Sequence, residues 1–376
     1  MSYGNPAARS LPDFPWDRLV PFADIARSHP DGIIDLSIGT PVDPTPSVIQ
    51  AALAAATDAP GYPTTVGLPE LRQAALGWFR RCLGVTALDL DAIIPTIGSK
   101  EIVAWLPTLL GLTPRDAVAI PTTAYPTYDV GARIAGCAVL TADTSDELEN
   151  LRKKVEATGR RLAMVWVNSP SNPTGRVLTV DELRTIVTWG RTHEVLVVSD
   201  ECYLELGWDV TPTSILHPTV IGDSLTGVLA VHSLSKRSNL AGYRAGVVAG
   251  DKNLIAQLLE IRKHAGMILS TPVQRAAIAA FNDDEHVAVQ RERYRARRDV
   301  LRSALTTAGF DIHHSNAGLY LWATRGEHCW QTVEWLAQRG VLVAPGSFYG
   351  AAGEQFVRVA LTATDERIGR ISARLS

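Results

Sequence analysis

The sequence has few cysteines and no excess of charge of either sign. Its cysteines are Cys82, Cys137, Cys202 and Cys329. They form no Cys-x-x-Cys pair and have no histidine at zinc-ligand spacing, so we expect reduced thiols and no metal site. A formal net charge of -3 provides no basic surface for nucleic acid or for an anionic membrane.

Long hydrophobic runs are also missing. No apolar stretch reaches the roughly 18–20 residues that a membrane span needs, and the first residues show no signal-peptide pattern. We therefore expect a cytoplasmic protein. The 376 residues, 46% of them hydrophobic and 20% charged, suffice for one large and one small globular domain.

Short runs of apolar and β-branched residues recur through the middle of the chain. They lie at residues 117–121, 162–167, 195–199, 228–232 and 245–249. Consecutive apolar positions over about a strand's length are typical of a sheet that is covered on both faces. Helix-like segments lie between the runs, and one of them opens with a cap at Thr179 followed by Glu182. This alternation predicts an α/β domain over residues 45–265, with a mostly parallel central sheet flanked by helices.

The last third of the chain has a different pattern. Residues 286–307 have the pattern of a charged amphipathic helix, and residues 318–323, 341–344 and 356–361 have that of short strands. We expect residues 1–44 to pack on this tail and on a partner subunit. Residues 1–44 and 266–376 are thus predicted to form a smaller α+β domain.

A lysine with unusual neighbours follows the predicted strand at 228–232. Lys236 lies close to Ser233 and Ser235, and Arg244 follows eight residues later. A lysine that attacks a carbonyl needs a lowered pKa, which burial and nearby cations provide. Arginine and hydroxyl groups together bind phosphate well. Most single lysines are solvated surface groups, but this context favours a functional one.

Polar residues follow two further predicted strands. Asn172 lies in a Ser-Asn-Pro-Thr-Gly segment after the strand at 162–167, and Asp200 and Tyr203 follow the strand at 195–199. The carboxyl ends of parallel strands are where α/β sheets bind ligands. Taken singly, the first segment could be only a turn and Asp200 only a helix cap.

Together these motifs resemble the fold-type-I enzymes that depend on pyridoxal 5'-phosphate (PLP), in particular the class I/II aminotransferases. The spacing carries the resemblance. Asn172 precedes Asp200 by 28 residues, and Asp200 precedes Tyr203 by 3 and Lys236 by 36. The resemblance extends from about residue 35 to residue 361. It implies the fold-type-I transferase fold and PLP as the cofactor.

The resemblance also implies roles for these residues. Lys236 would carry PLP as a Schiff base and then move a proton during catalysis. Asp200 would pair with the protonated ring nitrogen and so keep the ring an electron sink. Asn172 and Tyr203 would bind the phenolic oxygen of the ring. The predicted catalytic residues are Lys236, Asp200 and Tyr203.

Two groups of residues would bind the cofactor phosphate. The first group is Ser233, Ser235 and Arg244. The second opens a predicted helix and consists of Gly98, Ser99 and Lys100. A Gly-Ser helix start exposes backbone N–H groups and the positive end of the helix dipole, which suits a phosphate. By itself this second signal is weak, because serine is a common cap.

Two tyrosines complete the implied cofactor site. Tyr125 follows the strand at 117–121, at the position of the aromatic residue that stacks on the pyridine ring in this family. Without the resemblance it could be an ordinary core residue. The segment at 61–72 resembles the one that crosses to the neighbouring subunit, where Tyr62 would reach the partner's phosphate. The resemblance thus implies a homodimer with shared active sites.

Arg358 interrupts the apolar strand pattern at 356–361. A buried arginine without a partner is costly, so it needs either a structural ion pair or a ligand. The resemblance makes it the clamp for the substrate α-carboxylate, which a planar guanidinium fits. Gly39 would bring a backbone N–H to the same carboxylate, because glycine permits a close approach. Asn172 and Lys100 complete the predicted substrate contacts.

The expected reaction is the exchange of an amino group between an amino acid, glutamate in the first instance, and a 2-oxo acid. Segments 11–17 and 35–46 resemble actinobacterial N-succinyldiaminopimelate aminotransferases of lysine biosynthesis. The acceptor would then be N-succinyl-2-amino-6-oxopimelate. The alternatives are an aspartate or aromatic aminotransferase and a PLP-dependent C–S β-lyase. A PLP-binding regulator is disfavoured, since no basic helix-turn-helix segment precedes the motifs.

Lys100 lies in the first turn of a predicted helix. There the helix dipole disfavours a cation by roughly 0.3–1 kcal/mol. The adjacent Glu101 or plain solvation could offset this cost. A nearby anion could do so as well, either the cofactor phosphate or a second substrate carboxylate. The resemblance favours the carboxylate, so we expect Lys100 to help hold the remote succinyl end.

Overall fold

The computed structural model describes residues 11–12 and 15–376, and its larger sheet has seven strands within them. The strand order is β2-β8-β7-β6-β5-β3-β4. The strands are β2 (Ile93–Thr96), β3 (Asp116–Ile120), β4 (Ala138–Thr141), β5 (Arg161–Asn168), β6 (Leu196–Asp200), β7 (Val228–Ser233) and β8 (Gly246–Gly250). Strand β8 is antiparallel to both of its neighbours, and the other strands run in one direction. The predicted mostly parallel sheet is confirmed.

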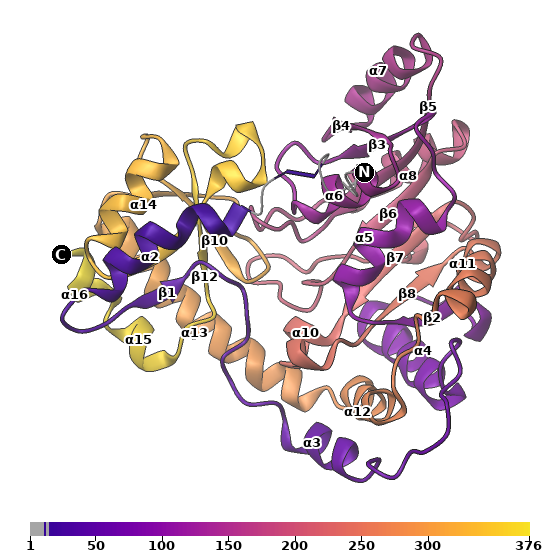
Figure 1. Ribbon diagram of the computed structural model, residues 1–376, viewed down its shortest axis with the longest axis horizontal. Helices are drawn as coiled ribbons and strands as arrows, with labels where there is room; N and C mark the ends of the chain where they lie inside the picture. Colours follow the sequence, from indigo (N-terminus) through magenta and orange to yellow (C-terminus); the bar gives the residue numbers. More distant parts are fainter. Residues whose placement is uncertain (1–10, 13–14) are drawn as a thin grey trace, which may run out of the picture.

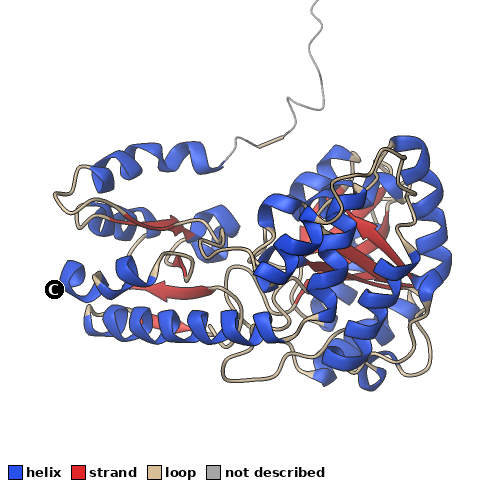
Figure 2. Ribbon diagram, turned by 90° about the horizontal axis from the view of Figure 1, so that it is seen from below, coloured by secondary structure: helices blue, strands red, loops and turns tan. Residues whose placement is uncertain are grey.

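Helices cover both faces of this sheet (Figure 2). On one face lie α3 (Ser47–Ala54), α4 (Pro69–Leu83), α7 (Ser145–Glu156), α8 (Val180–Thr192), α9 (Pro218–Ile221) and α12 (Thr271–Asn282). On the other lie α5 (Ser99–Leu109), α6 (Thr127–Ile134) and α11 (Lys252–Ala265). In β5, Val165 and Val167 enter the first core, whereas Met164 and Trp166 enter the second. Both faces are apolar, which explains why the strand's sequence shows no alternation.

The predicted start of α8 is a capping box. The Thr179 hydroxyl accepts from the Glu182 N–H at 3.2 Å, and the Glu182 carboxylate accepts from the Thr179 N–H at 2.7 Å. Each side chain thus satisfies a backbone donor that the helix leaves free.

The smaller sheet has the order β1-β11-β12-β10-β9. Its strands are β1 (Ile34–Leu36), β9 (Asp311–His313), β10 (Tyr320–Thr324), β11 (Val341–Pro345) and β12 (Val357–Ala360). Packed with it are η1 (Pro15–Leu19), α2 (Val20–Arg27), α13 (Glu285–Thr307), α14 (Cys329–Ala337), η4 (Gly346–Tyr349), η5 (Ala351–Gly353), α15 (Asp365–Gly369) and α16 (Ile371–Leu375). Strand β1 pairs in parallel with β11. The described part of the N-terminal segment thus packs on the tail through β1. Asp13 and Phe14 of the 11–17 segment lie outside the described residues, and packing on a partner subunit stays a prediction.

The two sheets lie side by side in Figure 1, with the smaller one at the left. Helix α12 packs against α3 and α4 and adds Ala276 and Phe281 to the core of the larger unit. The predicted small domain begins at residue 266, before this helix, and that boundary stays a prediction. Across the described residues, no helix is both long and apolar enough to cross a membrane.

Candidate active site

The predicted functional residues gather at the carboxyl ends of three adjacent strands. Strands β5, β6 and β7 are neighbours in parallel, and Asn168 pairs in register with Asp200. The loop after β5 carries Asn172, Asp200 ends β6, and Lys236 lies just past β7 in α10 (Leu234–Arg237). The smaller sheet adds Arg358 from β12. Sheet topology thus assembles residues that are up to 186 positions apart in sequence.

Lys236 has the environment that its proposed chemistry needs. Its ammonium donates to the Gly39 carbonyl in the segment after β1. Burial lowers the pKa of the Lys236 amine, and the nearby charges of Arg358 and Arg244 lower this pKa further, against the opposing influence of Tyr320 and Cys202. A lysine with a depressed pKa is more often neutral near pH 7, and only the neutral amine is a nucleophile.

Asp200 is buried and contacts neutral donors. Its Oδ2 accepts from the Tyr128 hydroxyl at 2.9 Å, and its Oδ1 accepts from the Cys202 N–H at 3.2 Å. Burial raises the pKa of Asp200, whereas hydrogen bonds from the Cys202 side chain, the Tyr128 hydroxyl and the Cys202 N–H lower it in part, as does the charge of His232. Within the described chain, no cation lies at ion-pair distance from this carboxylate. A buried carboxylate that has only neutral donors and no cationic partner can bind a cationic group of a ligand.

Arg358 is buried with its guanidinium facing this cluster. It donates to the Asn172 side-chain oxygen at 2.9 Å and to the Ser37 carbonyl at 2.7 Å. Its Cζ lies 4.0 Å from the centre of the Tyr320 ring. No acidic residue in the described part of the chain forms an ion pair with it, so the alternative of a structural ion pair is not supported. A guanidinium held by neutral acceptors keeps its charge available for a substrate anion.

The two predicted phosphate-binding groups lie against each other. Gly98 has a φ of 72° and precedes α5, and a Cβ added there would come within 2.7 Å of Arg244 Cζ. Arg244 donates to the Ala241 carbonyl at 2.9 Å, next to η3 (Ala241–Tyr243), and has no acidic partner among the described residues. Ser233 caps α10 by accepting from the Ser235 N–H at 3.1 Å. Ser99 is in hydrogen-bonding contact with the Cys202 thiol, which brings the start of α5 to the end of β6.

Tyr125 lies at the same place, between β3 and α6. Burial raises the pKa of Tyr125 to about 12, and the nearby Asp200 contributes to this rise. The N–H of the preceding Ala124 donates to the Tyr349 carbonyl at 2.8 Å, so this loop also contacts the smaller unit.

Two of the predicted residues do not join the cluster in the single chain. Lys100 is exposed. Its neighbour Glu101 is engaged elsewhere, since it pairs with the buried Arg262 at 2.7 Å and accepts from the Ile97 N–H at 3.1 Å. Glu101 therefore does not offset the position of Lys100 at the helix start. Tyr62 is fully exposed.

Three further tyrosines belong to this cluster and were not predicted from the sequence. Tyr128 binds Asp200, the Tyr320 hydroxyl lies 3.1 Å from that of Tyr203, and Tyr349 is fully buried beside Arg358. Tyr128 lies three residues after Tyr125, so a helix turn at this point would have been a usable signal. Tyr320 lies in an apolar strand with no local signal.

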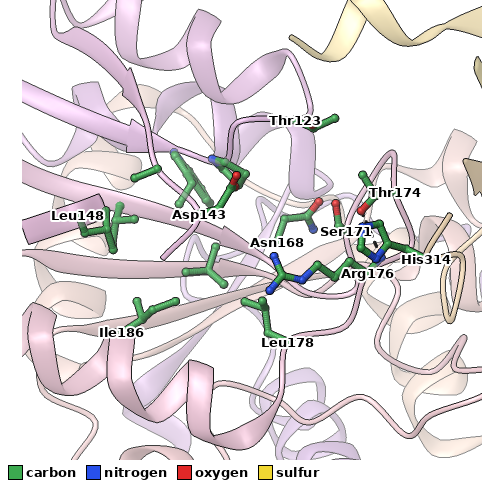
Figure 3. Close-up of a pocket in the computed structure, with 15 residues that line it drawn as sticks. Thr123, Asp143, Leu148, Asn168, Ser171, Thr174, Arg176, Leu178, Ile186 and His314 are labelled. Carbon is green, nitrogen blue, oxygen red and sulfur yellow. Dashed lines mark hydrogen bonds between the residues drawn. The ribbon is translucent and has the colours of Figure 1, made fainter. Parts of the chain in front are cut away.

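A cavity beside the cluster does not contain this chemistry. A cavity of about 160 Å³ lies between β5 and helices α7 and α8, and includes Asp143, Arg176 and Ile186 (Figure 3). Ser171 and Thr174 line it, while Asn172 between them contacts Arg358 instead. The candidate active site is therefore the cluster around Lys236 and Asp200, where the charged groups converge.

The arrangement fits PLP. A flat ring with a cationic nitrogen matches Asp200, a phosphate matches Arg244 beside the start of α5, and an aldehyde matches the Lys236 amine. Asp200 and Arg244 carry charges opposite to those of the ring nitrogen and the phosphate, and the Lys236 amine can react with the aldehyde.

Comparisons with known proteins agree with this chemistry. A profile described as "Aminotransferase class I and II" matches residues 31–375. The chain is 57% identical to the 4-dedimethylamino-4-oxo-anhydrotetracycline transaminase OxyQ of Streptomyces rimosus, over 98% of this chain and 100% of that protein. It is 58% identical to the probable aminotransferase Rv1178 of Mycobacterium tuberculosis, over 98% of this chain and 86% of that protein. The LL-diaminopimelate aminotransferase of Gloeobacter violaceus is 35% identical, over 95% and 96% of the two chains.

Solved structures show the same fold. An aminotransferase from Neisseria meningitidis superposes with a TM-score of 0.89 at 32% identity, covering 99% of both chains. The aminotransferase AspB from Helicobacter pylori gives 0.86 at 27% identity, covering 97% of this chain and 98% of that one. The likeness spans both units of the chain.

Proposed function

The chain belongs to the aminotransferase class I and II family and uses PLP, and from this premise we propose that it transfers the amino group of glutamate to a 2-oxo acid with a second, remote carboxylate. The observation that carries the proposal is Arg358. Its buried guanidinium is held by neutral acceptors beside Asn172. A substrate α-carboxylate is the group that such a guanidinium binds best.

The residues of the site have distinct tasks in this proposal. When bound, PLP supplies an electron-withdrawing ring that stabilises negative charge on the substrate Cα. Arg358 fixes the α-carboxylate and so orients the Cα–H bond. The Lys236 amine, whose pKa is lowered by burial, takes the proton from Cα and returns it to the product. Asp200 holds the ring nitrogen in its protonated form, and Arg244 with Gly98 and Ser99 anchors the phosphate.

Asn172 and Tyr203 are proposed to bind the phenolic oxygen of the ring, and Ser233 and Ser235 to line the phosphate pocket. Tyr125 would stack on the ring face. Asn172, Tyr203, Ser233 and Ser235 are buried near the strand ends and Tyr125 is half-buried, which supports these roles. The backbone of Gly39 would meet the substrate carboxylate, at a position where a Cβ would lie 2.8 Å from Tyr320 Cζ.

The acceptor that we propose first is N-succinyl-2-amino-6-oxopimelate, in lysine biosynthesis. It carries one carboxylate next to its oxo group, for Arg358, and further carboxylates at its far end. Lys100 is exposed at the start of α5, and Glu101 pairs with Arg262 rather than with it. That leaves the Lys100 ammonium free to attract a remote anion. The similarity to an LL-diaminopimelate aminotransferase supports a substrate built on a seven-carbon chain with a carboxylate at each end.

The second candidate acceptor is a polycyclic ketone. The full-length identity of 57% to a protein named as a 4-dedimethylamino-4-oxo-anhydrotetracycline transaminase favours it. This acceptor carries its oxo group on a ring instead of next to a carboxylate, so Arg358 would serve the amino donor alone.

The test is a half-reaction screen monitored by the absorbance of the cofactor. The amino forms of both acceptors are compared with glutamate, in wild type and in Arg358→Ala. We expect Arg358→Ala to slow glutamate and N-succinyl-diaminopimelate by about a hundredfold or more, as expected for a lost charge-assisted contact. Arg339→Ala, which removes an arginine that stacks on Trp335, is the control and should leave both rates unchanged. Release of ammonia and pyruvate without amino transfer would instead indicate a β-lyase.

We further propose a homodimer with shared active sites. The side chain of Tyr62 is fully exposed in the single chain, as expected for a residue that completes the site of a partner. The exposed Ile38 and Val42 flank the Gly39 segment and would be covered in such an assembly.

A further inference from the structure

Asp200 presents a physical problem for the proposed function. The carboxylate must be ionised to pair with a protonated ring nitrogen, but burial raises the pKa of Asp200 and so favours the neutral acid. No cation in the described chain pairs with it. Something in the protein therefore has to favour the charged form and to aim it, and hydrogen-bond donors are the groups that can do both.

Tyr128 is placed to supply this help. Its hydroxyl donates to Asp200 Oδ2 at 2.9 Å, while the Cys202 N–H serves Oδ1 at 3.2 Å. Burial and the adjacent carboxylate raise the pKa of the Tyr128 hydroxyl well above its usual value. The proton thus stays on Tyr128, and the tyrosine acts as a donor at any working pH. The Cys202 side chain also hydrogen-bonds this carboxylate, so donors on both oxygens oppose its rotation.

The ring of Tyr128 is itself held in place. It stacks on Trp166 of β5, with ring centres 4.9 Å apart and an angle of 19°, and it meets the edge of Tyr125 at 5.7 Å. Tyr128 is fully buried in the first turn of α6, three residues after Tyr125. A single turn thus carries both the aromatic residue proposed to stack on the cofactor and the donor to Asp200.

We propose that Tyr128 is a positioning residue that orients the Asp200 carboxylate toward the ring nitrogen of PLP and keeps it charged. This rests on the proposed role of Asp200. Tyr128 touches neither substrate nor cofactor in this role and acts only through Asp200. Removing its hydroxyl takes one hydrogen-bond donor away from a buried carboxylate, which favours the protonated acid.

The experiment compares two cofactors in Tyr128→Phe. One is PLP and the other is an analogue in which carbon replaces the ring nitrogen, so that it cannot pair with Asp200. Dissociation constants come from titration of the full-length chain. Wild type should bind PLP about tenfold or more tightly than the analogue, as expected for a charge-assisted hydrogen bond. In Tyr128→Phe this preference should fall by about tenfold, with little change for the analogue.

The pH dependence gives a second readout. PLP affinity is lost as the pH falls through the pKa of Asp200, because the acid form cannot pair with the ring. Since the Tyr128 hydrogen bond lowers that pKa, Tyr128→Phe should shift the loss to higher pH. A purely structural role would not move this midpoint. Tyr294→Phe is the matched control, as it removes the hydroxyl of another buried tyrosine, which donates to Asn239 at 3.4 Å. It should leave preference and midpoint unchanged.

Three results would overturn the proposal. If Tyr128→Phe weakens the binding of PLP and of the analogue equally, Tyr128 contributes only to packing. The proposed function would still stand. Wild-type affinity of Tyr128→Phe for both PLP and the analogue would show that the Tyr128 hydroxyl has no role in binding the cofactor. No preference in the wild type would remove the role of Asp200 itself and thus the premise. Should Tyr128→Phe not fold, Tyr128→His keeps a ring and an N–H donor and should retain most of the preference; its loss there would count against the proposal.

Discussion

Replacing Gly98 by alanine tests the phosphate site more sharply than removing a charge does. Gly98 has φ 72° and ψ 160°, a conformation that costs a non-glycine residue about 1–3 kcal/mol. The added Cβ would lie 2.7 Å from Arg244 Cζ, whereas ordinary contacts begin at 3.4 Å. Arg244 Nη2 lies closer still, so the guanidinium, as the end of a flexible side chain, has to move away.

That displacement has a definite consequence for the cofactor. The hydrogen bonds from Arg244 to a phosphate that also contacts the start of α5 would be longer and less well aligned. A charge-assisted hydrogen bond contributes about 1.5–3 kcal/mol. We therefore expect the affinity for PLP to fall by about ten- to a hundredfold in Gly98→Ala. Pyridoxal, which lacks the phosphate, should bind both proteins within about threefold of each other.

The assay is titration of the cofactor-free chain with PLP and with pyridoxal. Gly266→Ala is the control, because Gly266 also has a positive φ of 66° at the end of α11 but has no atom within 4 Å of an added Cβ. It should lower thermal stability without changing the ratio of the two affinities. The reasoning is refuted if Gly98→Ala binds PLP as well as Gly266→Ala does, or if pyridoxal is weakened as much as PLP.

Four further outcomes are expected. Lys236→Ala should remove turnover and the yellow colour of the attached cofactor, and near-wild-type activity would show that another amine does the work. Asp200→Ala should lower turnover by more than about tenfold, through loss of an electrostatic contact; a smaller loss in steady-state kinetics counts against its role. Lys100→Met should impair N-succinyl-diaminopimelate more than glutamate, whereas an equal effect on both kcat/KM values would assign Lys100 to the phosphate or to structure. Sedimentation should find an active dimer that Tyr62→Ala weakens in PLP binding, and an active monomer would exclude the shared site.

The sequence alone predicted five of the seven strands of the larger sheet and proposed the chemical groups of the candidate site. Consecutive apolar residues predicted β3, β5, β6, β7 and β8, because a strand buried on both faces needs them. The capping box at Thr179 predicted the start of α8 through purely local hydrogen bonds. The spacing from Asn172 to Arg244 identified the family, since each polar residue follows a strand end at a fixed distance.

Only the tertiary structure decided which groups meet. Strand β1 is a strand because it pairs with β11, some three hundred residues away, and nothing in its own three residues requires this. Helix α12 lies in the segment that the sequence assigned to the smaller domain, but it packs on α3 and α4. Local patterns specify a period and a buried face, but not the partner of that face.

Local sequence patterns also could not predict which residues of the candidate site contact each other. The contact from Tyr128 to Asp200 spans 72 residues, and that between Tyr203 and Tyr320 spans 117. Glu101, adjacent to Lys100 in sequence, turned out to pair with Arg262, 161 residues on. Hydrogen bonds between buried groups depend on the angle at which elements pack, to within a few tenths of an ångström. Sequence specifies that a buried polar group needs a partner, and the packing of the two units selects which one it receives.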